Sequence, residues 1–129
     1  MSAFLLVDDN PAHRMLARRA LKKSFPNHDT HEAATVAEAN ELLSKQEIIM
    51  AVVDFNLDHE SGLAIINHIR VTQNNQSLPI LIISTSELPA DIYASYRAGA
   101  NCYLVKAADP GRFQSDLLSA VTFFGSGIE

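Results

Sequence analysis

The sequence predicts an α/β fold in which a doubly wound, five-stranded parallel sheet lies between two layers of helices. Residues 48–53 and 78–83 are continuous apolar runs, which are typical of strands covered on both faces. Segments with the apolar spacing of helices alternate with such runs, as in chains built from successive strand–helix units. With 129 residues, 47% of them hydrophobic, the chain is long enough for one domain with its own core.

The N-terminal third contains two strand–helix units. A strand is predicted over residues 3–7, and a helix begins soon after it because Asn10 and Pro11 suit the N-cap and first helical positions. Pro26 ends this helix, and residues 30–34 are predicted as the second strand.

The rest of the chain continues the alternation. Thr35 and Glu38 have the spacing of a capping box, which predicts a helix that runs to about Lys45. The later strands are predicted over 48–53, 78–83 and 102–105. The later helices are one that starts at Ser61-Gly62 with Leu63, Ile66 and Ile69 as its apolar stripe, one over 87–98 and one over 109–124. Gly99 suits the C-cap of the second of these helices.

Composition narrows the classes of function. The net charge is −5, so we expect no nucleic-acid partner for this domain, since such a partner needs a basic face. The basic residues within 14–23 are interpreted as a solvated helix face rather than a phosphate-binding patch. No apolar stretch approaches the roughly 18 residues of a membrane span. The single Cys fits a reducing compartment, and we expect a cytoplasmic protein.

Polar side chains follow the well-defined apolar runs where each strand is predicted to end. They are Asp8 and Asp9, then Asp54, then the hydroxyl residues Ser84, Thr85 and Ser86, and finally Lys106. The carboxyl ends of parallel strands share one edge of the sheet, so we expect these side chains to converge there.

The chemistry of this set suits a phosphoryl group. Three neighbouring carboxylates repel one another unless a cation lies among them, and oxygen ligands favour Mg²⁺. Lys106 can neutralise a further anion, and a hydroxyl group can donate to it. One Asp after a strand is usually a helix cap, but the combination indicates a carboxylate nucleophile with a metal and an ammonium beside it.

At these residues the sequence resembles the receiver domain of two-component response regulators, whose fold is a flavodoxin-like (βα)5 three-layer sandwich. The resemblance covers nearly the whole chain and includes Gly62, eight residues after Asp54. It implies a receiver domain over 1–124 and a flexible tail or the start of a linker over 125–129. The segment 83–106 is similar to single-domain regulators that partner phytochrome-type sensor kinases.

The resemblance implies a role for each acidic residue. Asp54 would accept a phosphoryl group from a phosphohistidine of a sensor histidine kinase or phosphotransfer protein. Asp9 and Asp54 would bind Mg²⁺ directly, together with the backbone carbonyl of Asn56. Asp8 would act mainly through a metal-bound water.

It also implies a switch that is read by partner proteins. Lys106 would pair with the phosphoryl oxygens, Ser84 would bond to them, and Tyr103 would turn inward as the switch aromatic; Thr85 is the second choice for the hydroxyl. The expected partners are the kinase and a downstream target. A homodimer through the last helices is a further expectation, with Phe123 as an interface candidate.

Three residues depart from the family pattern. Ala107 and Asp58 stand where the family has prolines, and Thr85 stands where a smaller residue is common. Because a cis bond without proline costs about 3 kcal/mol, we expect a trans bond before Ala107. These departures leave open a docking module of the same fold that works without phosphorylation. A phosphohydrolase with an Asp nucleophile is a third hypothesis, but the position of its second Asp is taken by Asn56.

Overall fold

A computed structural model describes residues 2–126, and the main sheet contains five strands. The strands are β1 (Ser2–Val7), β2 (Asp29–Ala33), β3 (Glu47–Asp54), β6 (Ile80–Ser84) and β7 (Cys102–Val105). The helices are α1 (Pro11–Ser24), α2 (Val36–Lys45), α3 (Leu63–Asn67), α4 (Pro89–Ala98) and α5 (Pro110–Phe124). A short hairpin, β4 (Asn56–Leu57) and β5 (Glu60–Ser61), precedes α3, and a π-helical turn, η1 (His68–Thr72), extends it.

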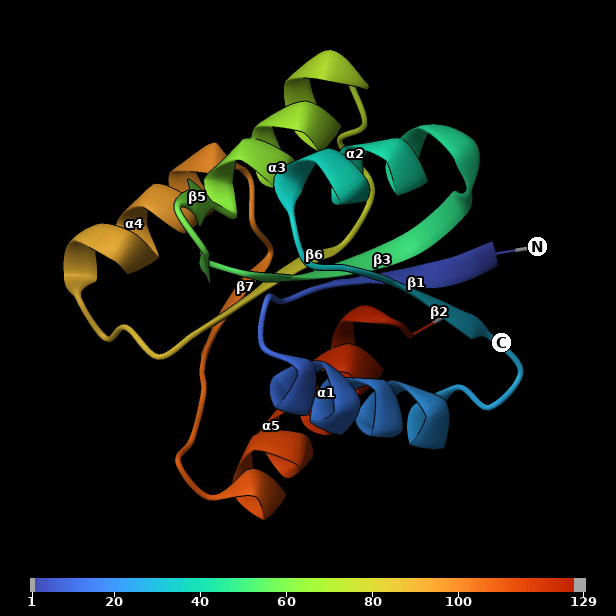
Figure 1. The fold of residues 1–129 in the computed structure, drawn as a ribbon, viewed down its shortest axis with the longest axis vertical. Coiled ribbons are helices and arrows are strands. Elements are labelled where there is room, and N and C mark those ends of the chain that lie inside the picture. Colours follow the sequence, from blue (N-terminus) through green and yellow to red (C-terminus); the bar gives the residue numbers. More distant parts are fainter. Residues whose placement is uncertain (1, 127–129) are drawn as a thin grey trace.

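The sheet has the order β2-β1-β3-β6-β7, and every neighbouring pair is parallel. Helices α1 and α5 cover one face, and α2, α3 and α4 cover the other (Figure 1). The predicted doubly wound, three-layer architecture is therefore confirmed. The strand order reverses between β1 and β3, which is where such sheets open a crevice for a ligand.

Each face of the sheet buries its own hydrophobic core. Leu5 and Val7 of β1 point into the cluster under α2 and α3, whereas Phe4 and Leu6 point into the cluster under α1 and α5. This alternation follows from the two-residue period of a strand. It explains why the inner strands are continuous apolar runs, since both of their faces are buried.

The N-caps predicted for α1 and α2 and the C-cap predicted for α4 are confirmed, with one difference in the capping box of α2, whereas α4 begins at Pro89, two residues later than predicted. The Asn10 side chain accepts hydrogen bonds from the backbone of α1, and Pro11 is its first residue. The Thr35 hydroxyl caps α2 by accepting from the Glu38 amide, but the Glu38 carboxylate accepts from Ala34, one residue before the N-cap. Gly99 ends α4 with a φ of 121°, a conformation that favours glycine.

The π-helical turn η1 was not predicted, and it carries a buried arginine. Arg70 is 8% exposed, and burial lowers the pKa of its guanidinium. Its Nε and Nη2 donate to the Gly99 carbonyl at 3.1 and 2.9 Å. The same guanidinium donates to the Asn75 carbonyl and the Asn101 side chain at 2.9 and 3.0 Å. Arg70 therefore ties η1 to the turn between α4 and β7.

We expect Arg70→Met to lower the free energy of unfolding by about 2–4 kcal/mol, because it leaves the partly buried carbonyls of Asn75 and Gly99 without their donor. Urea denaturation of both proteins measures the difference. Arg97→Met is the matched control, since Arg97 is exposed and contacts the ring and hydroxyl of Tyr93 on its own helix. Equal losses in the two variants would contradict a structural role for Arg70.

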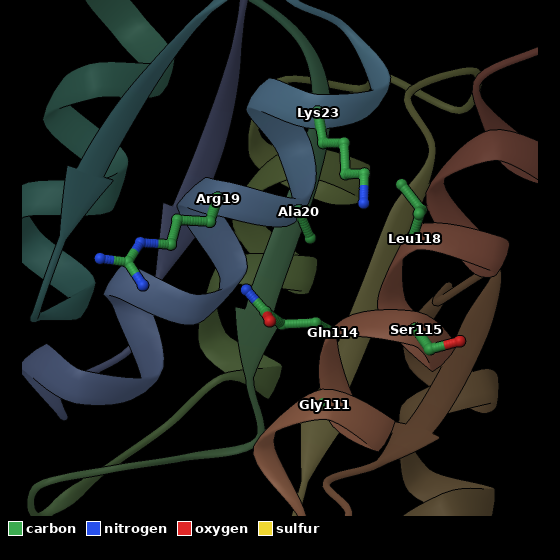
Figure 2. A pocket seen from close by; sticks show the side chains of 7 residues that line it. All are labelled: Arg19, Ala20, Lys23, Gly111, Gln114, Ser115 and Leu118. Carbon is green, nitrogen blue, oxygen red and sulfur yellow. The ribbon is translucent and has the colours of Figure 1, made fainter.

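A groove of about 350 Å³ runs between α1 and α5. Figure 2 shows the Lys23 side chain extending into the space between the two helices, while the Arg19 side chain extends away from α5. On the same helix, Arg18 pairs with Glu32 at 2.7 Å. The basic side chains of α1 point in different directions, in keeping with the interpretation of a solvated helix face.

The predicted tail begins directly after α5. Gly125 is buried as the C-cap of this helix, and its amide donates to the Val121 carbonyl at 2.8 Å. The packed chain thus includes the first residue of the predicted tail, and residues 127–129 of that tail lie outside the described residues. Within residues 2–126, no helix is long and apolar enough to cross a membrane.

Candidate functional site

The three predicted acidic residues meet at one edge of the sheet. Val7 of β1 is paired with Val53 of β3, so the residues that follow them, Asp8 and Asp54, lie side by side. One carboxylate oxygen from each of Asp8, Asp9 and Asp54 lies within 4.8 Å of the others. Asp8 is completely buried and Asp54 is 6% exposed, whereas Asp9 faces solvent. Three carboxylates at this spacing fit a hard divalent cation, which prefers oxygen ligands.

Lys106 reaches the same point from the end of β7. Its Nζ lies 2.9 Å from Asp8 Oδ2 and 3.0 Å from Asp54 Oδ2, and its side chain is 6% exposed. The third contact, 3.0 Å from His13 Nδ1, was not predicted. The ammonium thus offsets part of the repulsion between two buried carboxylates.

The carboxyl of Asp54 has an altered affinity for protons. Burial is the largest cause and raises its pKa to about 6 from the usual 3.8; Lys106 opposes this shift, and the neighbouring Asp8 carboxylate adds to it. Asp54 Oδ1 also accepts from the Asn56 amide at 3.2 Å. A pKa of about 6 still leaves Asp54 mostly ionised at neutral pH, as a nucleophile requires.

Asp58, one of the departures from the family pattern, takes part in the site through its backbone. Its amide donates to Asp9 Oδ2 at 2.9 Å, across the mouth of the acidic cluster. A proline at this position has no N–H and could not make this bond. Asp58 is also the first of the two residues that turn the β4–β5 hairpin, an element that the sequence did not predict.

The predicted hydroxyl and aromatic residues lie on β6 and β7 and on the loop that follows β6. Ser84 ends β6 and is fully buried, and its carbonyl accepts from the Lys106 amide at 2.6 Å, whereas Thr85 is exposed. The Tyr103 hydroxyl donates to the Ser86 carbonyl at 2.8 Å. The two candidates for the switch are therefore connected through the loop that follows β6.

Ala107 follows Lys106 through a trans bond, as expected, since residues 2–126 contain no cis peptide. Its side chain is partly buried against the cluster under α1 and α5.

Gly62 has a steric reason for its position. Its amide donates to the Phe55 carbonyl at 2.8 Å, and a Cβ there would lie 2.2 Å from the Asp54 carbonyl oxygen. The loop after Asp54 can pass this close to the strand only without a side chain.

We expect Gly62→Ala to displace the loop that carries Asn56 and Asp58, and to lower the free energy of unfolding by about 1–3 kcal/mol through overpacking. Thermal unfolding gives the loss of stability. Gly111→Ala is the control, because a Cβ at Gly111 meets nothing closer than 3.7 Å. A Gly62 variant as stable as the Gly111 variant would contradict the close approach.

The comparisons with known proteins agree with this geometry. The family model of the response regulator receiver domain matches residues 4–118, and the chain belongs to this family of signalling domains.

CheY-like proteins are among the relatives and structural neighbours of this chain. A chemotaxis protein CheY homolog of Campylobacter jejuni is 29% identical over 124 residues, which cover 95% of this chain and 94% of the relative. The phosphorylated cyanobacterial phytochrome response regulator RcpA has 25% identity and a TM-score of 0.88, with 98% and 96% of the two chains covered. The Mn²⁺-bound form of response regulator Rcp1 has 23% identity and a TM-score of 0.86 at the same coverage, which shows a shared fold.

Proposed function

We propose that Asp54 is the phosphoacceptor of this receiver domain, and that a sensor histidine kinase or phosphotransfer protein supplies the phosphoryl group. The observation that carries the proposal is the position of one buried carboxylate between two further carboxylates and the Lys106 ammonium. In the transfer, an Asp54 oxygen bonds to phosphorus while the bond from phosphorus to the kinase imidazole breaks. The family membership and the phosphorylated neighbour RcpA support the same chemistry.

The metal in this proposal is Mg²⁺. Asp9, Asp54 and the backbone carbonyl of Asn56 would bind it directly, and Asp8 would act through a metal-bound water. When bound, Mg²⁺ supplies positive charge next to the incoming phosphoryl oxygens. The three clustered carboxylates support a divalent ion, and Mg²⁺ is the choice that carboxylates and waters favour.

The remaining residues would respond to the new charge. Lys106 would pair with a phosphoryl oxygen, and Ser84, in preference to the exposed Thr85, would bond to another. Tyr103, now tied to the Ser86 carbonyl, would turn inward with this loop. A new dianion at Asp54 thus biases a surface between two states, which is how phosphorylation acts in general.

We propose a cytoplasmic protein that signals through contacts and catalyses only its own phosphorylation and slow dephosphorylation. The description of RcpA as a phytochrome response regulator supports a phytochrome-type kinase as the phosphodonor. Phe123 is 74% exposed on α5, which supports a homodimer through the last helices. A downstream target protein would recognise the phosphorylated state.

The test is intact mass after incubation with Mg²⁺ and acetyl phosphate, for wild type and Asp54→Asn in parallel. We expect the wild type alone to gain one phosphoryl group, and a chelator to prevent the gain. No gain in the presence of bound Mg²⁺ and of a histidine kinase as donor would overturn the proposal. The docking module that works without phosphorylation, which the Ala107, Asp58 and Thr85 departures favour, would then be the better interpretation.

A further inference from the structure

We infer that His13 is a positioning residue for Lys106, which it holds toward Asp54 by accepting the third N–H of the ammonium. An ammonium has three donors. Two of them face Asp8 Oδ2 and Asp54 Oδ2, and His13 Nδ1 lies 3.0 Å from the same nitrogen. This inference rests on the proposed function, because it concerns the lysine that would pair with the phosphoryl group.

The contact indicates which nitrogen of the neutral imidazole accepts the hydrogen bond. Lys106 has only donors, so His13 Nδ1 is the acceptor of this hydrogen bond, and the ring proton is on Nε2. The alternative partner of Nδ1 is Asp8 Oδ2, but it lies 3.9 Å away, beyond the length of a hydrogen bond. The geometry therefore joins the imidazole to the lysine rather than to the carboxylate.

The start of α1 explains why His13 reaches this position. Asn10 and Pro11 begin the helix directly after the acid pair, so the first helical turn lies over the edge of the sheet. The His13 amide donates to the Asn10 side chain at 3.3 Å, which fixes its backbone. Its ring lies 6.4 Å from that of Phe113 on α5, centre to centre. The cap therefore fixes the backbone of His13, and the ring lies beside Phe113 of α5.

His13 also borders a hollow through which water could reach the Lys106 ammonium. The hollow, of about 230 Å³, is lined mainly by apolar side chains that include Leu16, Ala107 and Phe113. Lys106 and His13 both border this hollow. Without the imidazole acceptor, the third N–H of Lys106 would bond to water there, and the ammonium would be less firmly directed at Asp54.

The test compares wild type with His13→Leu, which removes the acceptor, and His13→Gln, which restores one in its side-chain carbonyl. Nitrogen-15 NMR of the protein without phosphoryl donor reads the tautomer of His13 and the exchange of the Lys106 ammonium protons. We expect the Nε2–H tautomer, slow ammonium exchange in the wild type and the Gln variant, and fast exchange in the Leu variant.

The second readout is the rate of phosphorylation by acetyl phosphate at saturating Mg²⁺. We expect His13→Leu to slow it by about fivefold to tenfold, the effect of losing one hydrogen bond of ordinary strength, and His13→Gln to recover most of the rate. His31→Leu on β2 is the control and should leave the rate unchanged.

The outcomes separate this inference from the proposed function. An Nδ1–H tautomer, or ammonium exchange that does not differ between wild type and His13→Leu, would overturn the positioning role. Equal rates in all variants would overturn it as well. A wild-type protein that gains no phosphoryl group would instead count against the proposed function, while the two NMR readouts would still decide the role of His13.

Discussion

In protein stripped of divalent metal, Asp54→Asn is expected to raise the free energy of unfolding at neutral pH by up to about 3 kcal/mol. The folded state holds the pKa of Asp54 at about 6, against 3.8 for an unperturbed carboxyl. A gap of this size corresponds to roughly 3 kcal/mol in favour of the protonated form. The ionised carboxylate therefore costs stability, and asparagine removes this cost because it is neutral and of similar shape.

The sign of the pH dependence follows from the same shift. A raised pKa in the folded state means that this state binds the proton more tightly, so its stability falls as pH rises from 3.8 through about 6. The gain from Asp54→Asn should be largest above pH 6 and should shrink as pH falls toward 3.8. Urea denaturation of both proteins in a chelator, across this range, measures it. A gain that does not change with pH would contradict the explanation.

Added Mg²⁺ should narrow the difference, because a ligand that binds only the folded state stabilises it. The wild type would gain more than Asp54→Asn, which would have lost one of its ligands. The ionised carboxylate of Asp54 destabilises the metal-free folded state, and binding a cation would offset this cost.

Replacing Lys106 by Met is expected to lower the free energy of unfolding strongly, whereas Asp54→Asn raises it. The variant leaves the carboxylates of Asp8 and Asp54 without the ammonium that now contacts both. Breaking a buried ion pair from one side costs about 3–5 kcal/mol, and we expect a loss of this order in metal-free protein at neutral pH. Phosphorylation by acetyl phosphate should slow by about 10²- to 10³-fold, as when one charge-stabilising donor is removed from an active site.

A double-mutant cycle separates the contribution of the Lys106–Asp54 contact to stability from the other contributions of Lys106. In an Asp54→Asn background, Lys106→Met should cost much less, because one of the two carboxylates is already neutral. Lys45→Met is the control, since Lys45 pairs with Glu41 on the exposed surface of α2 and such pairs contribute little. If the Lys106 variant lost the same stability in both backgrounds, the Lys106–Asp54 contact would not be the cause.

The order of strands and helices and the residues of the acidic cluster could be predicted from patterns of residue type in the sequence. The continuous apolar runs predicted β3 and β6, and the Asn10–Pro11 pair predicted the start of α1 within one residue. Asp8, Asp9, Asp54 and Lys106 could be predicted to meet because the ends of parallel strands share one edge. Each strand end can be predicted from the residues next to it, and the parallel sheet brings these ends together in space.

The unpredicted features depend on contacts between distant segments. Nothing near His13 in the sequence marks it, because its partner is Lys106, 93 residues later. Nothing near Arg70 marks it as buried, because the Gly99 carbonyl and the Asn101 side chain that it contacts lie 29 and 31 residues later. The β4–β5 hairpin turns through His59 at a φ of 57°, which its residue type did not signal.

The amide of Asp58 offers a direct view of the acidic cluster. Since its proton is bonded to Asp9 Oδ2 rather than to another backbone group, its NMR chemical shift reports the state of that carboxylate. A cation that draws Asp9 toward the centre of the site would weaken or lengthen this bond, and the amide resonance would move in proportion to occupancy. A receiver with proline at this position has no such proton. This chain therefore carries an intrinsic, label-free indicator from which metal affinity can be titrated at a single residue.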